Sequence, residues 1–417
     1  MTAPRPLWFR GVTLVDPRAE TVRVGDLLVV DRTIAVVGQV DGAPDGVEVV
    51  DAPGVLLAPA LVDAGVFRAD LAACAVGGIA TALLMPDQDP PLDDPALVER
   101  AERLGKPHLW VRPLAAATRG LLGRELAELA LLAEAGAVAV ATGRQAVADA
   151  AVWLRVLRYA AGLGLVVVAH AEDPALAAGG VATEGRMATR LGLPAAPACA
   201  EALVVARDLR LAREAGAALH FACLSTAEAI ELVRMARAAG QDVTAGTSPA
   251  YALLDEEALA GFRSFARLSP PLRSAHDRAA VLQGLADGTL SMLTSRHDPR
   301  TTEEKRLPFA DAAPGAADGA LLLSLGVELV RAGHLSWPRL FQCVALGPAA
   351  RFGLPAGRLE PGAPADLVLV DPDHSFRIAA DRLPGLGRNT PFDGRDAWGR
   401  ALMLVKGGAV VFRAGPV

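Results

Sequence analysis

Short apolar runs alternate with helical segments through most of the chain, and this alternation limits the fold more than any other feature of the sequence. The apolar runs that we interpret as strands cover residues 57–63, 79–85, 109–113, 137–141, 165–170, 218–223, 242–247 and 289–295. Helical patterns rich in Ala, Leu, Arg and Glu lie between them, for example at residues 125–135, 200–215, 227–239 and 279–285. Strands that alternate with helices form parallel sheets. The pattern therefore predicts an α/β fold, a (β/α)8 barrel of the TIM type.

A second pattern, of strands joined by turns, occupies both ends of the chain. The N-terminal strands are expected at residues 7–15, 26–30, 33–37 and 47–57, and the C-terminal strands at 365–371 and 401–412. This divides the chain into residues 1–56, a barrel of residues 57–350, and residues 351–417. We expect the two terminal parts to combine into one small β-sandwich.

Composition argues against several classes of protein. The 417 residues carry a formal charge of -6 with both signs interspersed, so no basic surface for nucleic acid is indicated. Charges, Gly or Pro interrupt the apolar stretches well short of the roughly 18 to 20 residues of a membrane span, and no signal-peptide pattern is present. The four cysteines stand far apart, which suits reduced thiols. We expect a cytoplasmic protein without membrane or nucleic-acid partners.

A series of short motifs runs along nearly the whole chain. In order they are LMPDQDPP at 84–91, GLLGRELAE at 120–128, HAEDP at 170–174, LSTAE at 224–228, PPLR at 270–273, TEEK at 302–305, AARFGL at 349–354, GRLEPGAPADLVLVD at 357–371 and NTPF at 389–392. In order and spacing they resemble the dihydroorotase and allantoinase branch of the amidohydrolase superfamily. That resemblance implies the barrel and the terminal β unit packed beside it, with a metal site at the carboxyl ends of the barrel strands.

The metal-ligand positions that the resemblance implies are mostly changed. The family motif Asp-x-His-x-His after strand 1 reads DAGVF at 63–67, so Gly65 and Phe67 replace two imidazoles. Neither side chain can donate a lone pair to zinc. The family carboxylate after strand 4 falls at Thr142, and the family histidine of strand 6 is Cys223.

The change at strand 8 affects the chemistry most. The family sequence Asp-His-Ala-Pro-His is replaced by RHDPR at 296–300, so the aspartate that acts as metal ligand and general base aligns with Arg296. A guanidinium is a permanent cation that cannot accept a proton from water, and its charge opposes a nearby dication. We therefore expect no catalytic residues and no bound cofactor. We also expect Arg296 to enter the barrel mouth and to hydrogen-bond Asp63 in the space where the family holds its metals.

Substrate-binding positions have changed as well. The family asparagines align with Asp87 and Ser269. A carboxylate at position 87 would repel an anionic dihydroorotate. Asp63, Arg68 and His297 complete the expected remnants of the substrate pocket, with Arg68 as the candidate for the family arginine that binds the substrate carboxylate.

His170 is the one ligand position clearly retained, and a single histidine at a strand end is more often structural than metal-binding. An alternative is a relocated zinc site built from His170, Cys223 and either His220 or His297, because catalytic zinc needs three protein ligands and an open position. The odd spacing of His220 and Cys223 along one strand opposes their joining one site. Cys223 is otherwise a small buried residue, or a nucleophile if a base stands beside it.

The resemblance implies three functions. Some inactive dihydroorotase homologues assemble with aspartate carbamoyltransferase, the preceding enzyme of pyrimidine synthesis, so the first is a noncatalytic partner of that enzyme in a homo- or hetero-oligomer. The second is a hydrolase of cyclic amides with an altered or single-zinc site. The third is a binding module that holds a small ligand in the old pocket without reaction.

Overall fold

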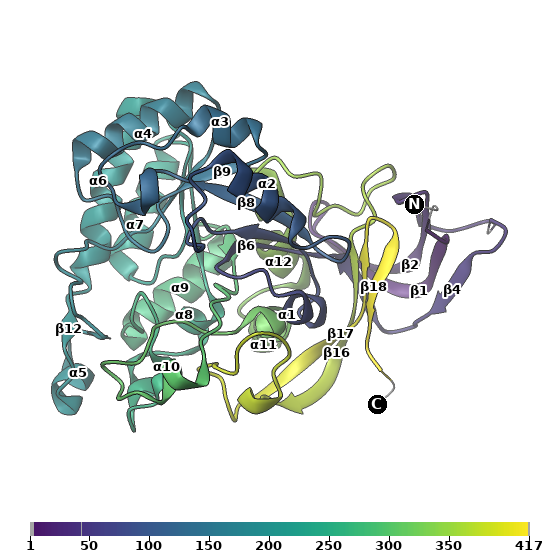
Figure 1. Cartoon of the computed structure of the whole chain (residues 1–417). Coiled ribbons are helices and arrows are strands. Elements are labelled where there is room, and N and C mark those ends of the chain that lie inside the picture. The colour runs from purple at the N-terminus through teal and green to yellow at the C-terminus, as the bar shows by residue number, and fades with distance from the viewer. Residues whose placement is uncertain (1–3, 43, 416–417) are drawn as a thin grey trace.

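Two large sheets organise the computed structural model, which describes residues 4–42 and 44–415 (Figure 1). The parallel strands of the first pair in the order β6 (Leu61–Val66), β7 (Ile79–Leu84), β8 (Trp110–Ala116), β9 (Ala139–Ala141), β10 (Val167–Ala169), β13 (Leu219–Phe221), β14 (Val243–Thr247) and β15 (Met292–Leu293). This nearly closed eight-stranded sheet confirms the predicted barrel.

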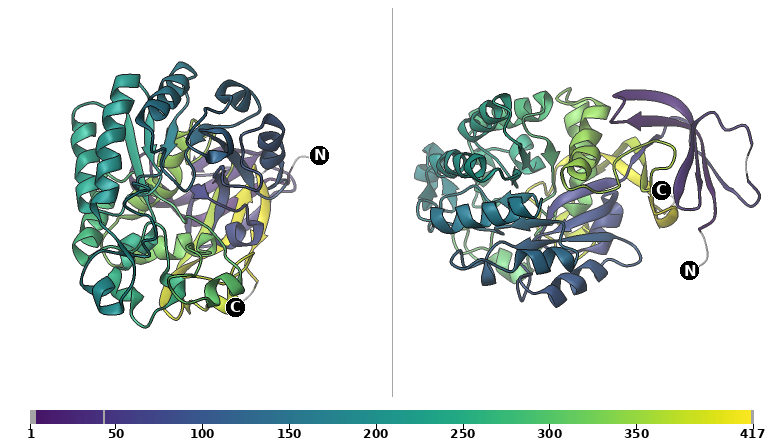
Figure 2. Two further views of the ribbon diagram at one scale, coloured as in Figure 1. Left: turned by 60° about the vertical axis from the view of Figure 1, so that its left-hand side comes forward. Right: turned by 90° about the horizontal axis from the view of Figure 1, so that it is seen from above.

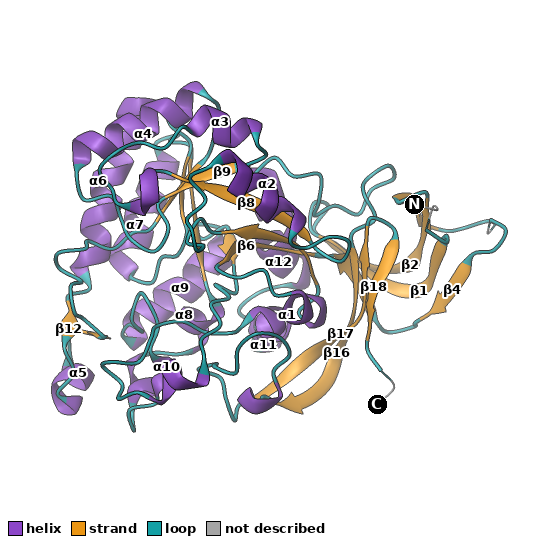
Figure 3. Ribbon diagram, in the orientation of Figure 1, coloured by secondary structure: helices purple, strands orange, loops and turns teal. Residues whose placement is uncertain are grey.

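Helices cover the outside of the barrel strands (Figure 3). They are α1 (Leu71–Val76), α2 (Pro95–Arg103), α3 (Leu129–Glu134), α4 (Ala150–Gly162), α6 (Cys199–Ala215), α7 (Ala227–Ala238), α9 (Ala275–Asp287) and α11 (Leu322–Arg331). In α4 the buried side chains Trp153, Val156, Leu157 and Ala160 recur at the spacing of one helical face. Burial of that face against the strands fixes α4 as a barrel helix.

The barrel interior is packed with side chains at the end opposite its mouth. Val62, Leu114 and Met292 point into it from three strands and form one buried cluster with Phe352 and Leu354. Phe352 follows α12 (Trp337–Phe341) and α13 (Gly347–Arg351). The segment after α13 therefore closes the N-terminal end of the barrel, as in other barrels whose centre is a core and not a pore.

Side-chain and loop contacts join the first barrel strand to the last. Asp63 on β6 accepts hydrogen bonds from the backbone N–H of Ser295, at 3.0 Å, and from the Ser295 hydroxyl. The backbone N–H of Phe67 donates to the carbonyl of His297 at 2.9 Å. These contacts span the seam between β6 and β15, where no strand pairing is recorded among the described residues. Asp63 thus serves to close the barrel.

Both ends of the chain build the second sheet. Its order is β18 (Ala409–Arg413), β17 (Asp396–Lys406), β16 (Leu367–Arg377), β5 (Leu56–Pro59), β1 (Leu7–Asp16), β2 (Thr21–Val30) and β3 (Thr33–Gly38), and β4 (Glu48–Asp51) pairs with β1. It lies to one side of the barrel (Figures 1 and 2). Leu7, Phe9, Leu27 and Leu369 belong to its own buried core. The terminal β unit is therefore present as expected.

The predicted strand at 57–63 is in fact two strands of different sheets. The backbone N–H of Ala60 donates to Asp366 beside the terminal sheet, and that of Leu61 donates to Gly78 in the barrel, each at 2.9 Å. The predicted strand at 47–57 is likewise divided into β4 and β5. Apolar continuity marks buried backbone, but it does not show which partner each residue pairs with.

Smaller elements complete the described chain: β11 (Ala182–Thr183), β12 (Ala195–Ala196), α5 (Arg186–Leu191), α8 (Pro249–Leu253) and α10 (Thr302–Arg306), together with short 3-10 turns. Within residues 4–42 and 44–415, no helix combines the length and the apolar character that crossing a bilayer requires.

A buried polar network fixes α6 against the start of α7. Glu201, fully buried on α6, accepts hydrogen bonds from the backbone N–H and the hydroxyl of both Ser225 and Thr226. Arg273 donates to the Ser225 hydroxyl at 3.0 Å and lies 3.7 Å from the Glu201 carboxylate. A buried carboxylate is tolerated here because its oxygens are fully hydrogen-bonded beside a cation.

Replacing the carboxylate of Glu201 should therefore destabilise the fold. We expect Glu201→Ala to lower the free energy of unfolding by about 3 to 5 kcal/mol, because four donors and the Arg273 charge lose their acceptor. Urea unfolding followed by circular dichroism measures this, with the exposed Glu214→Ala as control. Equal unfolding midpoints for the two variants would contradict it.

Candidate functional site

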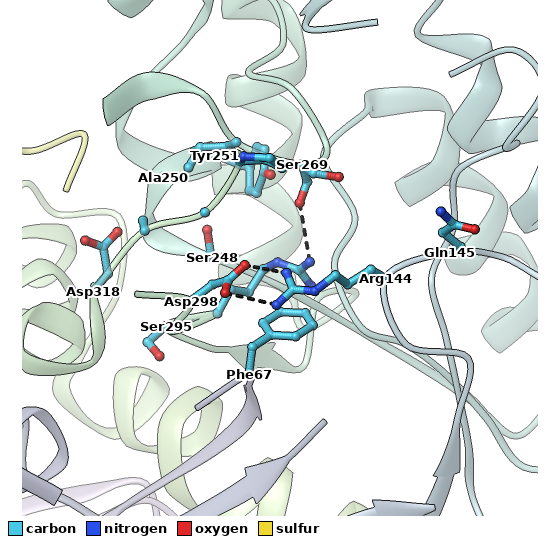
Figure 4. A pocket seen from close by; sticks show the side chains of 15 residues that line it. Phe67, Arg144, Gln145, Ser248, Ala250, Tyr251, Ser269, Ser295, Asp298 and Asp318 are labelled. Atoms are coloured by element: carbon cyan, nitrogen blue, oxygen red, sulfur yellow. Dashed lines mark hydrogen bonds and ion pairs between the residues drawn. The ribbon is translucent and has the colours of Figure 1, made fainter. Parts of the chain in front are cut away.

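A pocket of about 240 Å³ opens at the carboxyl ends of the barrel strands (Figure 4). Phe67 follows β6, Arg144 follows β9, Ser248 follows β14 and Arg296 follows β15, and Tyr251 on α8 forms part of the wall. This is the end of the barrel at which such folds place their sites. The pocket therefore marks the place where the implied metal site has to be sought.

An ion pair crosses the mouth of the barrel at this pocket. Arg144 Nη2 lies 2.9 Å from Asp298 Oδ1, and Nη1 makes a second bond to Oδ2 (Figure 4). Arg300 donates from Nη2 to Asp298 Oδ2 at 2.7 Å. The side chain of Asp298 is only 6% exposed, so two guanidiniums compensate one buried carboxylate.

Phe67 lies beneath the guanidinium of Arg144. The guanidinium carbon is 3.8 Å from the centroid of the ring, which is a close cation–π contact. The Phe67 side chain is buried, and Arg296 approaches the same ring at 5.4 Å. At Gly65, a β-carbon would lie 3.1 Å from the Thr294 hydroxyl. The two positions that the resemblance assigns to imidazoles are thus a cation-covered ring and a backbone with a side chain against it.

Asp87 fixes the loop that carries Arg144. Its Oδ1 accepts the backbone N–H of Arg144 at 2.9 Å. Gly143 has a φ of +78°, and a β-carbon there would lie 2.7 Å from Asp87 Oδ1, so the turn requires glycine. Burial raises the pKa of Asp87 despite the Arg144 charge. Asp87 lies behind the pocket wall and supports the loop.

Arg296 does not bind Asp63, which corrects the sequence-based expectation. The guanidinium lines the pocket and donates from Nη2 to the Ser269 carbonyl at 3.3 Å. Asp63 is fully buried in the seam with Ser295 and lies outside the pocket wall. Burial raises its pKa against the hydrogen bonds from Ser295. The Ser295 bonds satisfy this carboxylate, so it offers no acceptor facing the mouth.

His170 and Thr142 are brought together, but as parts of the scaffold. The Thr142 hydroxyl accepts the backbone N–H of His170 at 2.9 Å, and the His170 ring lies 3.7 Å from Glu172. Burial opposes ionisation of Glu172, but the hydrogen bond and charge of His170 and the charge of Arg273 outweigh it and lower its pKa. The carboxylate beside His170 is thus shared with Arg273, at 3.4 Å.

The members of the relocated zinc site are not assembled. Nδ1 of His220 lies 2.8 Å from the Thr244 hydroxyl, and its ring packs edge-on against Phe352 at the closed end of the barrel. Burial lowers the pKa of His220 to about 3. Burial also raises the pKa of Cys223 to about 11, despite the nearby charge of Arg296, so its thiol is not an activated nucleophile.

His297 and Arg68 lie away from the pocket, a second correction to the expected substrate remnants. His297 is buried, with Nε2 3.3 Å from Asp70 Oδ2, and Nδ1 accepts the backbone N–H of Gly319 at 3.0 Å. It therefore links the first helix to the segment before α11. Arg68 is exposed and is absent from the pocket wall, whereas Ser269 is part of that wall.

Asp318 is a carboxyl of the pocket wall that the sequence did not single out. It is buried, and its Oδ1 has no hydrogen-bond partner among the described residues. Burial raises the pKa of Asp318 to about 7, although the Thr390 hydroxyl and the charges of His297 and Lys305 oppose the rise. The group is therefore partly protonated at neutral pH.

The residues at the mouth do not fit the metal that the family resemblance implies. No group of three or more His, Cys, Asp or Glu side chains within residues 4–42 and 44–415 is arranged to hold an ion. Asp298 is paired with two arginines, Asp63 is bonded to Ser295, and the Arg144 guanidinium brings a positive charge to the mouth. A dication there would face a fixed cation and no free ligand set.

Arg144 was the functional residue that sequence reasoning missed. It follows Thr142, a position already identified as a lost carboxylate, so its neighbourhood was known. The useful signal was charge: a new arginine beside a lost metal position, and a carboxylate, Asp298, left in the strand 8 loop. Which arginine reaches that carboxylate depends on the arrangement of two loops far apart in sequence.

The pair of Arg144 and Asp298 should contribute more to stability than Arg296 does. We expect Arg144→Ala to lower the free energy of unfolding by about 2 kcal/mol, because the side chain is partly exposed and Asp298 keeps Arg300. Arg296→Ala should cost less than about 1 kcal/mol, since only one long hydrogen bond is lost.

A double-mutant cycle with Arg144→Ala and Asp298→Ala measures the pair directly, by urea unfolding. The expected coupling free energy is about 1 to 3 kcal/mol. A coupling near zero, or a larger loss in Arg296→Ala than in Arg144→Ala, would show that the pair does not hold the mouth together.

Comparison with known proteins agrees with this fold. The Dihydro-orotase-like family model matches residues 57–229. The dihydroorotase of Pelotomaculum thermopropionicum is 41% identical over 98% of this chain and 98% of its own length. The dihydroorotase of Citrifermentans bemidjiense is 35% identical over 98% of this chain and all of its own length.

Solved structures show the same architecture. The L-hydantoinase (dihydropyrimidinase) of Arthrobacter aurescens superposes with a TM-score of 0.88 at 25% identity, covering 100% of this chain and 97% of the hydantoinase. The dihydropyrimidinase of Brevibacillus agri shares the fold with a TM-score of 0.83, covering 98% and 95% of the two chains at 23% identity. Since two relatives above 30% identity align over nearly the full length, the chain belongs to the dihydroorotase family of the amidohydrolase superfamily.

Proposed function

We propose that this chain is a dihydroorotase-like protein of pyrimidine biosynthesis that does not hydrolyse dihydroorotate by the metal-dependent route of its family. The names of its relatives support the pathway. The observation that carries the loss of activity is the Arg144 and Asp298 pair lying on Phe67 at the mouth of the barrel. A guanidinium at this place cannot activate water or polarise an amide as a bound dication would.

Hydrolysis of a cyclic amide needs an activated water and a group that protonates the leaving nitrogen. Asp298 cannot act as the base without leaving two arginines. Asp63 lies in the seam and not in the pocket. The strand 8 position that should supply the general base is a guanidinium, Arg296. The chain thus keeps the family scaffold without the family's acid–base apparatus.

The alternative is a hydrolase of cyclic amides with an altered site, and the names of the relatives favour this reading. One observation gives it a candidate base. Asp318 lines the pocket with an unpartnered oxygen, and burial raises its pKa to about 7, the range suited to a general base at neutral pH. Hydrolysis through Asp318 would not require the lost ligands.

A noncatalytic barrel is useful to a cell through its surface. The family resemblance suggests aspartate carbamoyltransferase as the partner, since inactive dihydroorotase homologues assemble with that enzyme. We propose a structural or regulatory role in such a hetero-oligomer, with dihydroorotate hydrolysis supplied by another protein. The partner rests on the resemblance, whereas the loss of chemistry rests on the residues of the mouth.

A turnover assay separates the two readings. We expect the purified chain, with or without added zinc, to hydrolyse dihydroorotate about a thousandfold or more slowly than the Pelotomaculum relative, because both the base and the metal ligands are replaced. Turnover comparable to that relative would refute the proposal. Turnover that disappears in Asp318→Asn while the protein stays folded would establish the alternative.

The partner is tested by co-elution with aspartate carbamoyltransferase from the same organism. Stable interfaces bury upwards of about 1,000 Å², so a complex should survive gel filtration at micromolar concentration. We expect co-elution and a change in carbamoyltransferase activity. The Pelotomaculum dihydroorotase serves as control for nonspecific association. Independent elution with unchanged activity would contradict the partnership.

A further inference from the structure

We propose that the mouth of the barrel binds a small organic monoanion, whose carboxylate is received by the guanidinium of Arg296. This goes beyond the proposed function and does not depend on the partner. It follows from three features of the pocket: an arginine without a counter-ion, a balance of one positive charge, and a small, mainly apolar space around it.

Arg296 differs from the other arginines at the mouth. Arg144 and Arg300 are both paired with Asp298. The Arg296 side chain makes one hydrogen bond within the described part of the chain, from Nη2 to the Ser269 carbonyl at 3.3 Å. A guanidinium carries five N–H donors, so most of those of Arg296 are free. A half-buried cation with unused donors is a receptor for a carboxylate.

The backbone holds Arg296 in an uncommon conformation. Its φ is +49°, in the left-handed region that a non-glycine residue adopts at a cost of about 1 kcal/mol or more. The Thr294 hydroxyl accepts the Arg296 backbone N–H at 3.1 Å and stabilises this turn. The chain thus maintains a strained conformation that leaves the guanidinium in the pocket wall.

The charges around the pocket select a single negative charge. Arg144 and Asp298 cancel each other, which leaves Arg296 and Asp318 in the wall. Because burial raises the pKa of Asp318 to about 7, that group carries less than a full negative charge at neutral pH. The wall therefore offers a partial net positive charge. A monoanion is compensated there, whereas a dianion brings a charge without a partner into a half-buried space.

The size and lining of the pocket describe the remainder of the ligand. A volume of about 240 Å³ equals roughly eight water molecules at about 30 Å³ each. Ala250, Leu268 and the ring of Tyr251 supply apolar wall, and the hydroxyls of Ser248 and Ser269 supply polar contacts. The Tyr251 hydroxyl already donates to the Pro270 carbonyl at 2.6 Å. The space thus suits one six-membered ring with a carboxylate.

Benzoate is the probe that matches this description, and isothermal titration calorimetry at pH 7.5 measures its binding. Benzamide is the neutral control of the same shape, and phthalate adds a second negative charge to the same ring. We expect binding of benzoate at millimolar concentration or below and at least tenfold weaker binding of benzamide and of phthalate. Arg296→Gln should weaken benzoate binding by about tenfold to a hundredfold, the effect of one charge-assisted contact.

Arg68→Gln is the matched control, because Arg68 is the exposed arginine at the position that the family resemblance connects with the substrate carboxylate. It should bind benzoate like the parent. Arg296→Lys, which keeps the charge, should bind more tightly than Arg296→Gln. Circular dichroism checks that each variant is folded. Equal binding of benzoate and benzamide, no benzoate binding at 10 mM of the kind that millimolar affinity would give, or loss of binding in Arg68→Gln alone would overturn the proposal.

Dihydroorotate as a second probe separates this inference from the proposed function. Binding that needs Arg296 without turnover supports both. Turnover would refute the proposed function, and the dependence of benzoate binding on Arg296 would still decide the anion site. Absence of benzoate binding together with absence of turnover would overturn the anion site and leave the proposed function intact.

Discussion

The paired arginine and aspartate at the barrel mouth are the interaction on which the character of this site depends. Arg144 comes from the loop after β9 and Asp298 from the loop after β15, and their bidentate contact joins two sides of the barrel. The buried ring of Phe67 supports the guanidinium from below. A cation is thus supplied by the protein where the family would place metal ions. The carboxylate and the ring that could have been ligand positions are used up by this arrangement.

The scaffold is maintained by other residues, which explains how the fold persists beside an altered site. Asp63 closes the seam of the barrel through Ser295, and Glu201 fixes α6 to the start of α7. Both are buried carboxylates with saturated hydrogen-bonding, and neither depends on a metal. Conversely, His170 keeps its family position but bonds within the scaffold. Retention of a family residue is therefore weak support for retained chemistry.

The sequence predicted the fold well because periodic burial is a local property. The expected strand at 79–85 is β7, Ile79–Leu84, and the expected helix at 200–215 is α6, Cys199–Ala215. Local pattern failed where pairing changes within one apolar run, at Ala60. The site was predicted only in what it lacks. The partner of Arg296 was wrong and the role of Arg144 was missed, because both depend on distances between loops that no local pattern contains.

The most direct test of this account is a crystal structure of the chain grown with excess zinc, with diffraction recorded at the zinc absorption edge. The account predicts no anomalous peak in the barrel mouth, with the Arg144 guanidinium on the Phe67 ring and both of its terminal nitrogens bonded to Asp298. A full-occupancy zinc peak at the mouth, with Arg144 displaced from Asp298, would contradict it.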